Sequence, residues 1–220
     1  MLYPEKRQVI IDTCLTMQHI GFFMGTWGNI SMRAGDQGEH IILTPSRVDY
    51  DVMVPEDLVV IDLEGNIIEG TRNPTSEKEV HRRIYVKRPD INAIIHTHSP
   101  KAMACSVLDV RHIPCMVDEM PQLIGGHLPL TKEYVETSQH ANLGRAAAAA
   151  IGDCNGVLLR NHGSVGCGRD MKEAITTVRV IEKACGIYLD IAPLKKRLIS
   201  DKDIEAGVYF YRVSYGRDKT

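Results

Sequence analysis

The sequence predicts a single α/β domain whose central, mainly antiparallel β-sheet carries helices on both faces. Its 220 residues suit one compact domain, and neither an internal repeat nor a break in composition marks a second one. Helix-like and strand-like segments do not alternate as the regular βαβ units that a parallel sheet requires. Two candidate hairpins also lie early in the chain, and hairpins join antiparallel strands. We therefore expect one domain over 1–220, with 201–220 as a C-terminal tail.

Composition and charge are those of an ordinary soluble protein, with 44% apolar and 25% charged residues. The net charge of −2 gives no electrostatic footprint for nucleic acid or an anionic membrane. No apolar run approaches the roughly 20 residues of a membrane span, and the first residues enter an amphipathic pattern without forming a signal peptide. The six cysteines are scattered without close pairs, so we expect free thiols in a reducing cytoplasm and neither disulfides nor a cysteine-type zinc site.

The first elements are a helix, a glycine-rich loop and short strands. Residues 4–20 have the apolar spacing of an amphipathic helix, which Gly21 ends. The loop 25–31 precedes a strand and can bring backbone N–H groups close to a bound anion, although taken alone it is more typical of a plain turn. A short strand then begins at Ile41 and runs into a polar loop that ends at Arg47. The segments 58–61 and 66–69 follow as two further strands that form a candidate hairpin.

A second helix is expected over 74–88. It should end at Arg88, because the next residue is a proline, which disfavours helix at the position before it. Ser76 followed by Glu79 fits a capping box, and that is a sufficient structural reason for both residues. The cap does not explain Thr75 or Glu77. These two positions are therefore candidates for a function.

The segment 91–98 reads as a buried strand that ends in polar residues. His96 and His98 are two apart, so in an extended chain they point the same way and can hold one metal ion. The alternative is a pair of ordinary polar histidines at a strand end. Ser99 and Pro100 then suit the N-cap and first turn of the helix that follows.

The second half of the chain continues with alternating strand-like and helical segments. Strands are expected over 113–117 and 156–160, and helices over 100–108, 132–151 and 171–190. The alanine run in 132–151 reflects helix propensity alone, with Gly152 as the stop. Asp170 and Glu173 fit the cap of the last long helix.

A third histidine, His162, follows the buried strand 156–160 and therefore also lies at a strand end. Together with His96, His98 and the carboxylate of Glu77 it makes a plausible zinc site, because zinc takes imidazole nitrogens and carboxylate oxygens. The same donors also suit manganese or cobalt. The remaining histidines are expected to be surface, cap or packing residues: His19, His40, His81, His112, His127 and His140.

Several motifs taken together resemble a known family. They are Ile10-Ile11-Asp12-Thr13-Cys14-Leu15, Gly25-Thr26-x-Gly28-Asn29, Thr44-Pro45-Ser46, Ser76-Glu77, His96-x-His98 and His162-Gly163. Their order and spacing resemble the class II aldolase and adducin-head family, most closely its fuculose-1-phosphate aldolase branch. The similarity covers nearly the whole chain and implies the class II aldolase-like version of the predicted fold.

The resemblance implies a zinc ion on His96, His98 and His162, one per subunit. It implies Glu77 near the metal, able to leave it and act as acid or base. It also implies a substrate phosphate pocket, which maps onto Thr26, Asn29, Ser46, Thr75 and Ser76.

Two positions depart from the branch. Arg47 replaces a glycine beside the phosphate pocket, where it either adds a bidentate phosphate contact or points to solvent. Glu119, with Asp118 as the alternative, stands where the branch has a catalytic tyrosine. A carboxylate can exchange a proton there if burial raises its pKa, but a solvated acidic turn is the competing interpretation.

The tail Ser214-Tyr215-Gly216 is similar to the family's C-terminal Tyr-Gly, whose tyrosine reaches a neighbouring subunit's site. The resemblance therefore implies a homotetramer with sites at subunit interfaces. The apolar residues Met120, Pro121, Leu123 and Ile124 either line a pocket for an aldehyde tail or form part of the core.

The resulting expectation is a zinc-dependent aldolase. It would cleave a ketose 1-phosphate of the fuculose, 5-deoxyribulose or 5-methylthioribulose type to dihydroxyacetone phosphate and an aldehyde. The alternatives in the same fold are a 5-methylthioribulose-1-phosphate dehydratase, a pentulose-phosphate 4-epimerase and, with less support, a non-catalytic adducin-like module. A dinucleotide enzyme is disfavoured because the glycines after His162 lack the required order.

Overall fold

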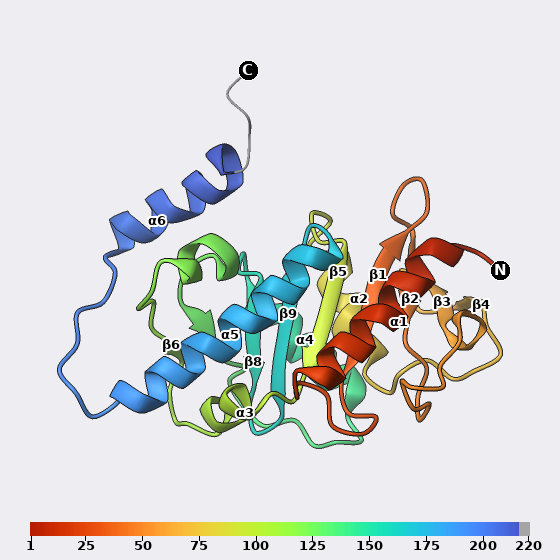
Figure 1. The fold of residues 1–220 in the computed structure, drawn as a ribbon, viewed down its shortest axis with the longest axis horizontal. Coiled ribbons are helices and arrows are strands. Elements are labelled where there is room, and N and C mark those ends of the chain that lie inside the picture. The colour runs from red at the N-terminus through yellow and green to blue at the C-terminus, as the bar shows by residue number, and fades with distance from the viewer. Residues whose placement is uncertain (216–220) are drawn as a thin grey trace.

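A seven-stranded sheet forms the centre of the computed structural model, which describes residues 1–215 (Figure 1). Its strands lie in the order β4-β3-β2-β1-β5-β9-β8, and all six neighbouring pairs are antiparallel. They are β1 (Asn29–Ala34), β2 (His40–Leu43), β3 (Val59–Asp62), β4 (Ile67–Glu69), β5 (Ala93–Thr97), β8 (Gly156–Leu159) and β9 (Gly163–Gly168). The expected antiparallel sheet is confirmed.

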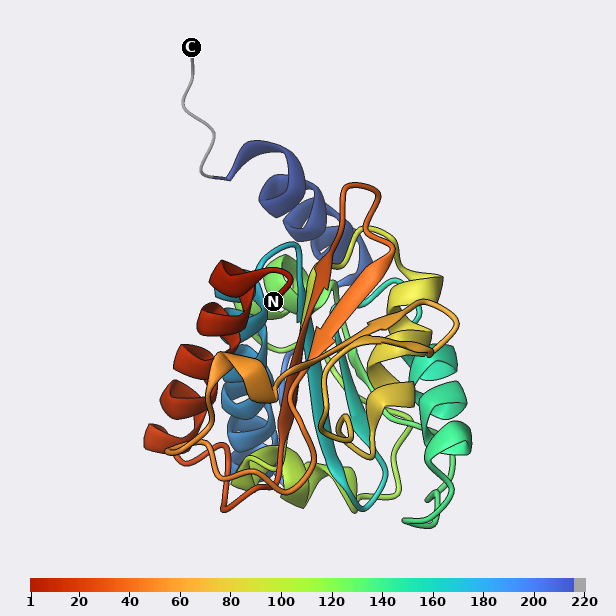
Figure 2. The same cartoon turned by 90° about the vertical axis from the view of Figure 1, so that its right-hand side faces the viewer.

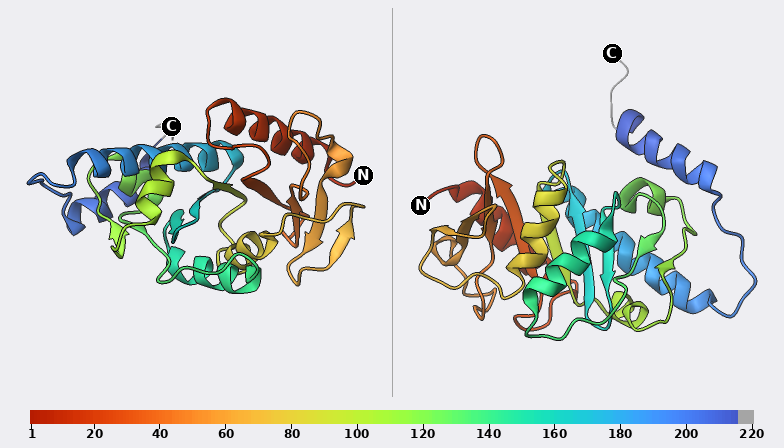
Figure 3. Two further views of the ribbon diagram at one scale, coloured as in Figure 1. Left: turned by 90° about the horizontal axis from the view of Figure 1, so that it is seen from below. Right: turned by 180° about the vertical axis from the view of Figure 1, so that it is seen from behind.

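Helices cover both faces of this sheet, as predicted (Figures 2 and 3). One face packs against α1 (Pro4–His19) and α5 (Met171–Ile191), and the other against α2 (Lys78–Lys87) and α4 (His140–Ile151). The two apolar clusters are separate, because alternate residues of each strand point to opposite faces. Along β5, Ile95 packs with the first cluster and Ile94 with the second.

Two shorter elements and the tail complete the chain. Helix α3 (Pro100–Ser106) follows β5, with Ser99 at the predicted N-cap position but without a side-chain capping bond. The small sheet of β6 (His112–Ile113) and β7 (Leu128–Pro129) lies beside α5, and α6 (Asp201–Tyr209) leads into a π-helical turn at Phe210–Ser214. Gly216 of the expected Tyr-Gly motif lies outside the described residues.

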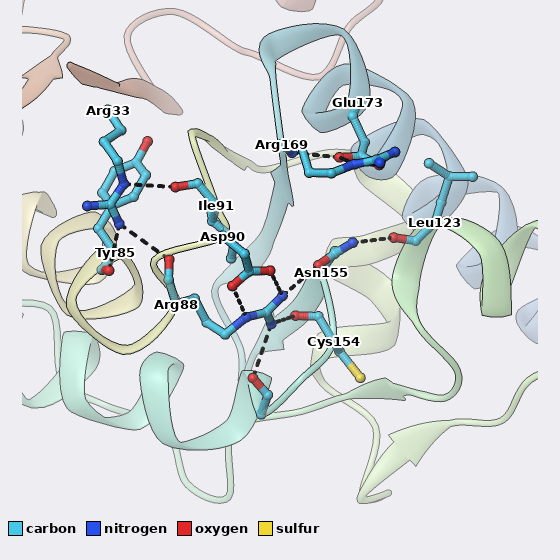
Figure 4. Close-up of polar contacts among 11 residues, drawn as sticks. Arg33, Tyr85, Arg88, Asp90, Ile91, Leu123, Cys154, Asn155, Arg169 and Glu173 are labelled. Atoms are coloured by element: carbon cyan, nitrogen blue, oxygen red, sulfur yellow. Dashed lines mark hydrogen bonds and ion pairs between the residues drawn. The ribbon is translucent and has the colours of Figure 1, made fainter. Parts of the chain in front are cut away.

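Polar contacts fix the end of the sheet where β5 begins (Figure 4). The Arg33 guanidinium donates to the carbonyls of Ile91 and Tyr85, and its carbon lies 4.8 Å from the centre of the Tyr85 ring. Arg88 pairs with Asp90 and donates to the carbonyl of Cys154 at 2.8 Å. These buried arginine contacts tie the start of β5 to α2 and to the chain before β8.

Strand β9 was not expected, because three of its six residues are glycine and glycine disfavours strands. Packing explains its composition. A Cβ on Gly166 would lie 2.5 Å from Val178 Cγ1, and one on Gly168 would lie 2.4 Å from the Ala174 nitrogen. Pairing with β5 on one side and β8 on the other overrides the weak local propensity.

Two expected elements were too long. The helix predicted over 132–151 begins only at His140. The segment before it is held to the end of β8 instead, because the Thr131 nitrogen donates to the Leu158 carbonyl. The strand predicted over 113–117 stops at Ile113, and the Cys115 nitrogen then donates to His127 Nδ1.

The capping box proposed for the second helix was also wrong. Helix α2 begins at Lys78 with Glu77 at the N-cap, and Glu79 pairs with Arg82 and Arg83 instead of reaching back to the chain. The cap of α5 is confirmed, because the Asp170 side chain accepts from the Glu173 nitrogen.

All six cysteines are free thiols. Among residues 1–215, no helix combines the length and apolar character that crossing a bilayer demands.

Candidate active site

Three histidines meet at one edge of the sheet. His96 comes from the end of β5, His98 from the residues just after it, and His162 from the turn between β8 and β9. Antiparallel pairing brings these segments together, because the end of β5 lies beside the start of β9. One ring nitrogen from each histidine lies within 4.8 Å of the others, and the ring centres are 4.9 to 5.1 Å apart.

Two of these histidines, His96 and His98, are held in the neutral state that binds metal ions. His96 Nδ1 donates to the Ser164 carbonyl at 2.9 Å, which leaves the lone pair of Nε2 facing the other rings. Burial lowers the pKa of His96. Burial, together with the neighbouring imidazoles His96 and His162, lowers the pKa of His98 to about 3.

Glu77 faces these rings from the N-terminus of α2. Its two carboxylate oxygens lie 2.8 Å from His162 Nε2 and 3.2 Å from His96 Nε2. Asn29 Nδ2 donates to the second oxygen at 2.7 Å. Burial alone would raise the pKa of Glu77, but His96, His162 and the Asn29 amide together hold it well below its usual range. The carboxylate is therefore ionised.

This donor set fits a catalytic zinc ion. Three imidazole nitrogens and one ionised carboxylate oxygen are ligands that zinc prefers, and one nitrogen from each ring lies close to the other two. The second nitrogen of His96 is already committed to the backbone, as is usual for a metal-binding histidine.

A cavity of about 590 Å³ opens beside the histidines. Its wall combines three loops, and hydrogen bonds from the Ser46 nitrogen to Asn73 and from the Thr75 nitrogen to Thr44 hold two of them together. All residues expected to bind phosphate line this cavity: Thr26, Asn29, Ser46, Arg47, Thr75 and Ser76.

Arg47 occupies the left-handed backbone region, with φ of 61°. This conformation is strained for any residue with a Cβ and costs glycine nothing, which explains why a glycine suits the position. The arginine is held there although its conformation is unfavourable.

Other lining residues were missed by the sequence analysis. Trp27 lines the cavity, with its ring stacked 6.2 Å from that of His98 and 62% of the residue exposed. Tyr134 and Thr137 line the cavity as well, and they were hidden because 132–139 was expected to be helix. His140, which was expected to be a surface, cap or packing residue, lines the cavity from the start of α4. Trp27 was visible only as the variable position of a glycine-rich motif.

Glu119 and Tyr215 are not among the residues that line the cavity of the described chain. Glu119 accepts a hydrogen bond from Lys183 on α5, and this contact lowers its pKa, contrary to the raised pKa that an acid at neutral pH needs. Asp118 is exposed. Tyr215, the last residue that the structure describes, is 61% exposed. The catalytic roles of these residues remain predictions.

The apolar residues after Glu119 belong to the core. Met120, Pro121, Leu123 and Ile124 are buried, and three of them pack in the cluster between α3 and α5. The aldehyde pocket that they were alternatively expected to form is therefore not present in the described chain.

His81 differs from its expected role as a surface, cap or simple packing residue. It is completely buried and hydrogen-bonds to Asn29, which in turn contacts Glu77. No spacing rule pointed to this contact, because His81 lies on α2 and its partner Asn29 lies 52 positions away, at the start of β1.

Comparison with known proteins agrees with this geometry. Residues 8–189 match the family described as Class II Aldolase and Adducin N-terminal domain. The chain is 34% identical over 206 residues to a 5-deoxy-D-ribulose 1-phosphate aldolase from Bacillus thuringiensis serovar kurstaki, covering 93% of this chain and 94% of the relative. It is 27% identical over 188 residues to the L-ribulose-5-phosphate 4-epimerase UlaF of Salmonella paratyphi B, covering 81% and 82%.

A solved L-fuculose 1-phosphate aldolase superposes with a TM-score of 0.88 at 28% identity, covering 96% of this chain and 98% of that one. The likeness therefore extends through the whole fold as well as the motifs.

Proposed function

Since this chain belongs to the class II aldolase and adducin N-terminal domain family, we propose that it is a zinc-dependent aldolase acting on a ketose 1-phosphate. The products are dihydroxyacetone phosphate and an aldehyde. The observation that carries this proposal is a cluster of three imidazoles and an ionised carboxylate beside a cavity that is lined by phosphate-type donors. The relative named as a 5-deoxyribulose-1-phosphate aldolase supports a short deoxy sugar phosphate as the first substrate to try.

His96, His98 and His162 would hold the zinc ion. When bound, zinc supplies a Lewis acid that stabilises negative charge developing on the substrate oxygens as the C3–C4 bond breaks. The chain keeps His96 and His98 neutral through burial, and the bond from His96 to the Ser164 carbonyl orients that ring.

The phosphate of the substrate lies among the donors of the three loops. Hydroxyl groups of Thr26, Ser46, Thr75 and Ser76 and the amide of Asn29 can each donate to a phosphate oxygen. The guanidinium of Arg47 adds a positive charge, and its strained backbone supports a functional reason for its presence, since strain of this kind gathers at binding sites.

Glu77 carries the proton at C3. Its carboxylate is ionised and lies against the imidazoles, so in the condensation direction it accepts the C3 proton of dihydroxyacetone phosphate. In the cleavage direction Glu77 must first take a proton from solvent, which it then gives to C3, while the C4 hydroxyl loses one proton to another group, so the two transfers balance.

The proton of the C4 hydroxyl requires another group. Glu119, Asp118 and Tyr215 are the candidates, and none lines the cavity of its own chain among residues 1–215. We therefore extend the proposal to a homotetramer in which a neighbouring copy completes the site. The exposed apolar residues of the tail support a contact of this kind: Tyr209, Phe210, Val213 and Tyr215.

A coupled assay for dihydroxyacetone phosphate tests the proposal. The panel is the 1-phosphates of fuculose, rhamnulose, ribulose, 5-deoxyribulose and 5-methylthioribulose, each with and without chelator. We expect release that chelator abolishes and zinc restores, loss of release in His96→Ala, and normal release in the control His19→Ala, which changes an exposed histidine.

The 4-epimerase relative makes epimerisation the second candidate. Product analysis separates the reactions, because an epimerase returns an unchanged carbon skeleton and a dehydratase releases water. Metal-loaded protein that yields no dihydroxyacetone phosphate from any substrate would contradict the aldolase.

A further inference from the structure

A continuous chain of buried hydrogen bonds runs from the candidate site into the space between β1 and α2. Asn29 Nδ2 donates to Glu77 Oε2 at 2.7 Å, and Asn29 Oδ1 lies 2.5 Å from His81 Nε2. His81 Nδ1 is 2.7 Å from Ser31 Oγ, which is 2.9 Å from the Tyr85 hydroxyl. Ser31 and His81 are completely buried, and Tyr85 is 1% exposed.

Chemistry fixes the direction of every bond in this chain. The carboxylate of Glu77 only accepts, so the amide nitrogen of Asn29 faces it and the amide oxygen faces His81. An amide oxygen also only accepts, so His81 carries its proton on Nε2. His81 Nδ1 is then an acceptor, to which Ser31 donates, and the Tyr85 hydroxyl donates to Ser31.

The far end of the chain is fixed as well. The Tyr85 ring lies 4.8 Å below the Arg33 guanidinium carbon, and that guanidinium is held by backbone carbonyls at the start of β5 (Figure 4). Burial lowers the pKa of His81 to about 3, so the ring stays neutral at physiological pH. All donors therefore point toward Glu77.

The orientation of the Asn29 amide has consequences on both sides of the site. With nitrogen toward Glu77, one N–H stabilises the carboxylate and the second remains for the cavity that Asn29 lines. A flipped amide would place its oxygen against a carboxylate and present an acceptor to a phosphate. A neutral His81 with its proton on Nε2 favours the first arrangement, since only that tautomer donates to the amide oxygen.

We propose that His81 is a positioning residue that sets the Asn29 amide, and through it the Glu77 carboxylate, by donating from Nε2. Ser31 and Tyr85 select the required tautomer. This inference rests on the proposed function in taking Asn29 and Glu77 as site residues. It does not depend on which sugar phosphate is cleaved.

The tautomer itself is the first test, and it uses the wild-type protein. Two-dimensional ¹H–¹⁵N spectra of the histidine side chains, assigned with His81→Gln, distinguish a proton on Nε2 from a proton on Nδ1 or on both. We expect His81 to be neutral and protonated at Nε2 at pH 7. A proton on Nδ1, or a charged ring, would overturn the proposal whether or not any variant folds.

Two variants of similar size form the matched test. The glutamine of His81→Gln reaches the Nε2 position and can donate to Asn29, whereas the asparagine of His81→Asn reaches only the Nδ1 position. Zinc affinity is measured by competition with a chelating dye on metal-free protein, and inorganic phosphate binding by calorimetry on zinc-loaded protein. We expect His81→Asn to bind zinc roughly 10–100-fold more weakly and to bind phosphate more weakly, with His81→Gln close to wild type.

The outcomes separate the two proposals. Equal losses in both variants would assign His81 to core packing alone, and wild-type binding in both would remove any role in positioning, so either result overturns the inference. If the tautomer and the variants behave as expected but no ketose phosphate releases dihydroxyacetone phosphate, the proposed aldolase fails and the positioning role stands.

Discussion

Asn29 has the largest number of roles of any single residue in the site. It begins β1, pairs with His96 across the sheet, contacts Glu77 and lines the cavity. A carboxylate beside three imidazoles needs a neutral donor that does not compete for a metal, and an amide meets that need. The chemistry of Glu77 therefore depends on a residue whose own orientation is set by buried neighbours.

Burial of His81 has an effect on stability that can be measured. The pKa of an exposed histidine, 6.5, falls to about 3 here. Between these two values the unfolded chain binds a proton that the folded chain does not, so the free energy of unfolding falls as pH falls from 6.5 toward 3. Each pH unit in this window removes about 1.4 kcal/mol.

Urea unfolding of metal-free wild type and His81→Gln between pH 6.5 and 3 measures the contribution of His81 to this pH dependence. The other titrating groups contribute equally to both proteins, so their effect cancels in the difference. We expect the wild type to lose stability more steeply, by the slope of one titrating group. Parallel curves would show that His81 is protonated in the folded protein.

Replacement of Arg47 by glycine should have opposite effects on stability and on substrate binding. Arg47→Gly relieves a left-handed backbone conformation and should stabilise the fold by about 1 kcal/mol. It also removes a charged donor from the phosphate cavity, so KM for the phosphorylated ketose should rise roughly tenfold or more.

Arg47→Ala is the control for this pair of effects, since it removes the charge and keeps the strain. It should share the higher KM without the gain in thermal stability. An unchanged KM in both variants would place the guanidinium in solvent and away from the phosphate.

At the scale of elements, the site depends on β9, the strand with the weakest local propensity. Gly166 and Gly168 let α5 approach the sheet. The strand begins directly after His162 and accepts the bond from His96 at the Ser164 carbonyl. The close packing of α5 on β9 and the placement of His96 and His162 therefore depend on the same strand.

Gly166→Ala tests that arrangement. The new Cβ would meet Val178 Cγ1 at 2.5 Å, so we expect a loss of about 1–3 kcal/mol in the free energy of unfolding. Gly186→Ala in α5 is the matched control, because its Cβ would meet Lys101 Cγ at an ordinary 3.6 Å. That change should stabilise the helix by roughly 1 kcal/mol. Equal stability of the two variants would mean that β9 and α5 can separate without cost.

At the scale of the whole molecule, the histidines and the proposed phosphate donors lie within one chain, whereas the groups proposed to handle the proton of the C4 hydroxyl do not line the same cavity. The tail carries Tyr215 on an exposed helical turn, and α6 contacts the body through the turn at Met120–Ile124. A site completed by a second copy would join these two parts.

Mixing of two inactive variants in one oligomer tests whether a second copy completes the site. His96→Ala and Tyr215→Phe should each be inactive alone, and co-expressed they should recover up to about a quarter of wild-type activity, because one interface in four combines two intact halves. No recovery from two folded, inactive variants would place both groups in the same chain. An active Tyr215→Phe would assign the C4 proton to Glu119 or Asp118.

The sequence by itself determined the sheet with helices on both faces and most of the site. Residue spacing predicted that His96 and His98 share one side of a strand end, and the positions of His162 and Glu77 at a strand end and a helix start made them candidates for the same site. The family motifs predicted which residues line the cavity beside them. These features are local, because strand periodicity and turn chemistry are written in neighbouring residues.

Tertiary structure alone decided the rest. Strand β9 exists because its partners and α5 outweigh the low propensity of its glycines, and the segment 132–139 forms a cavity wall because it is tied to the end of β8. The role of His81 arises from a chain of contacts among residues up to 54 positions apart. Hydrogen-bond direction and burial depend on which groups meet in space, and no spacing along one strand or helix contains that information.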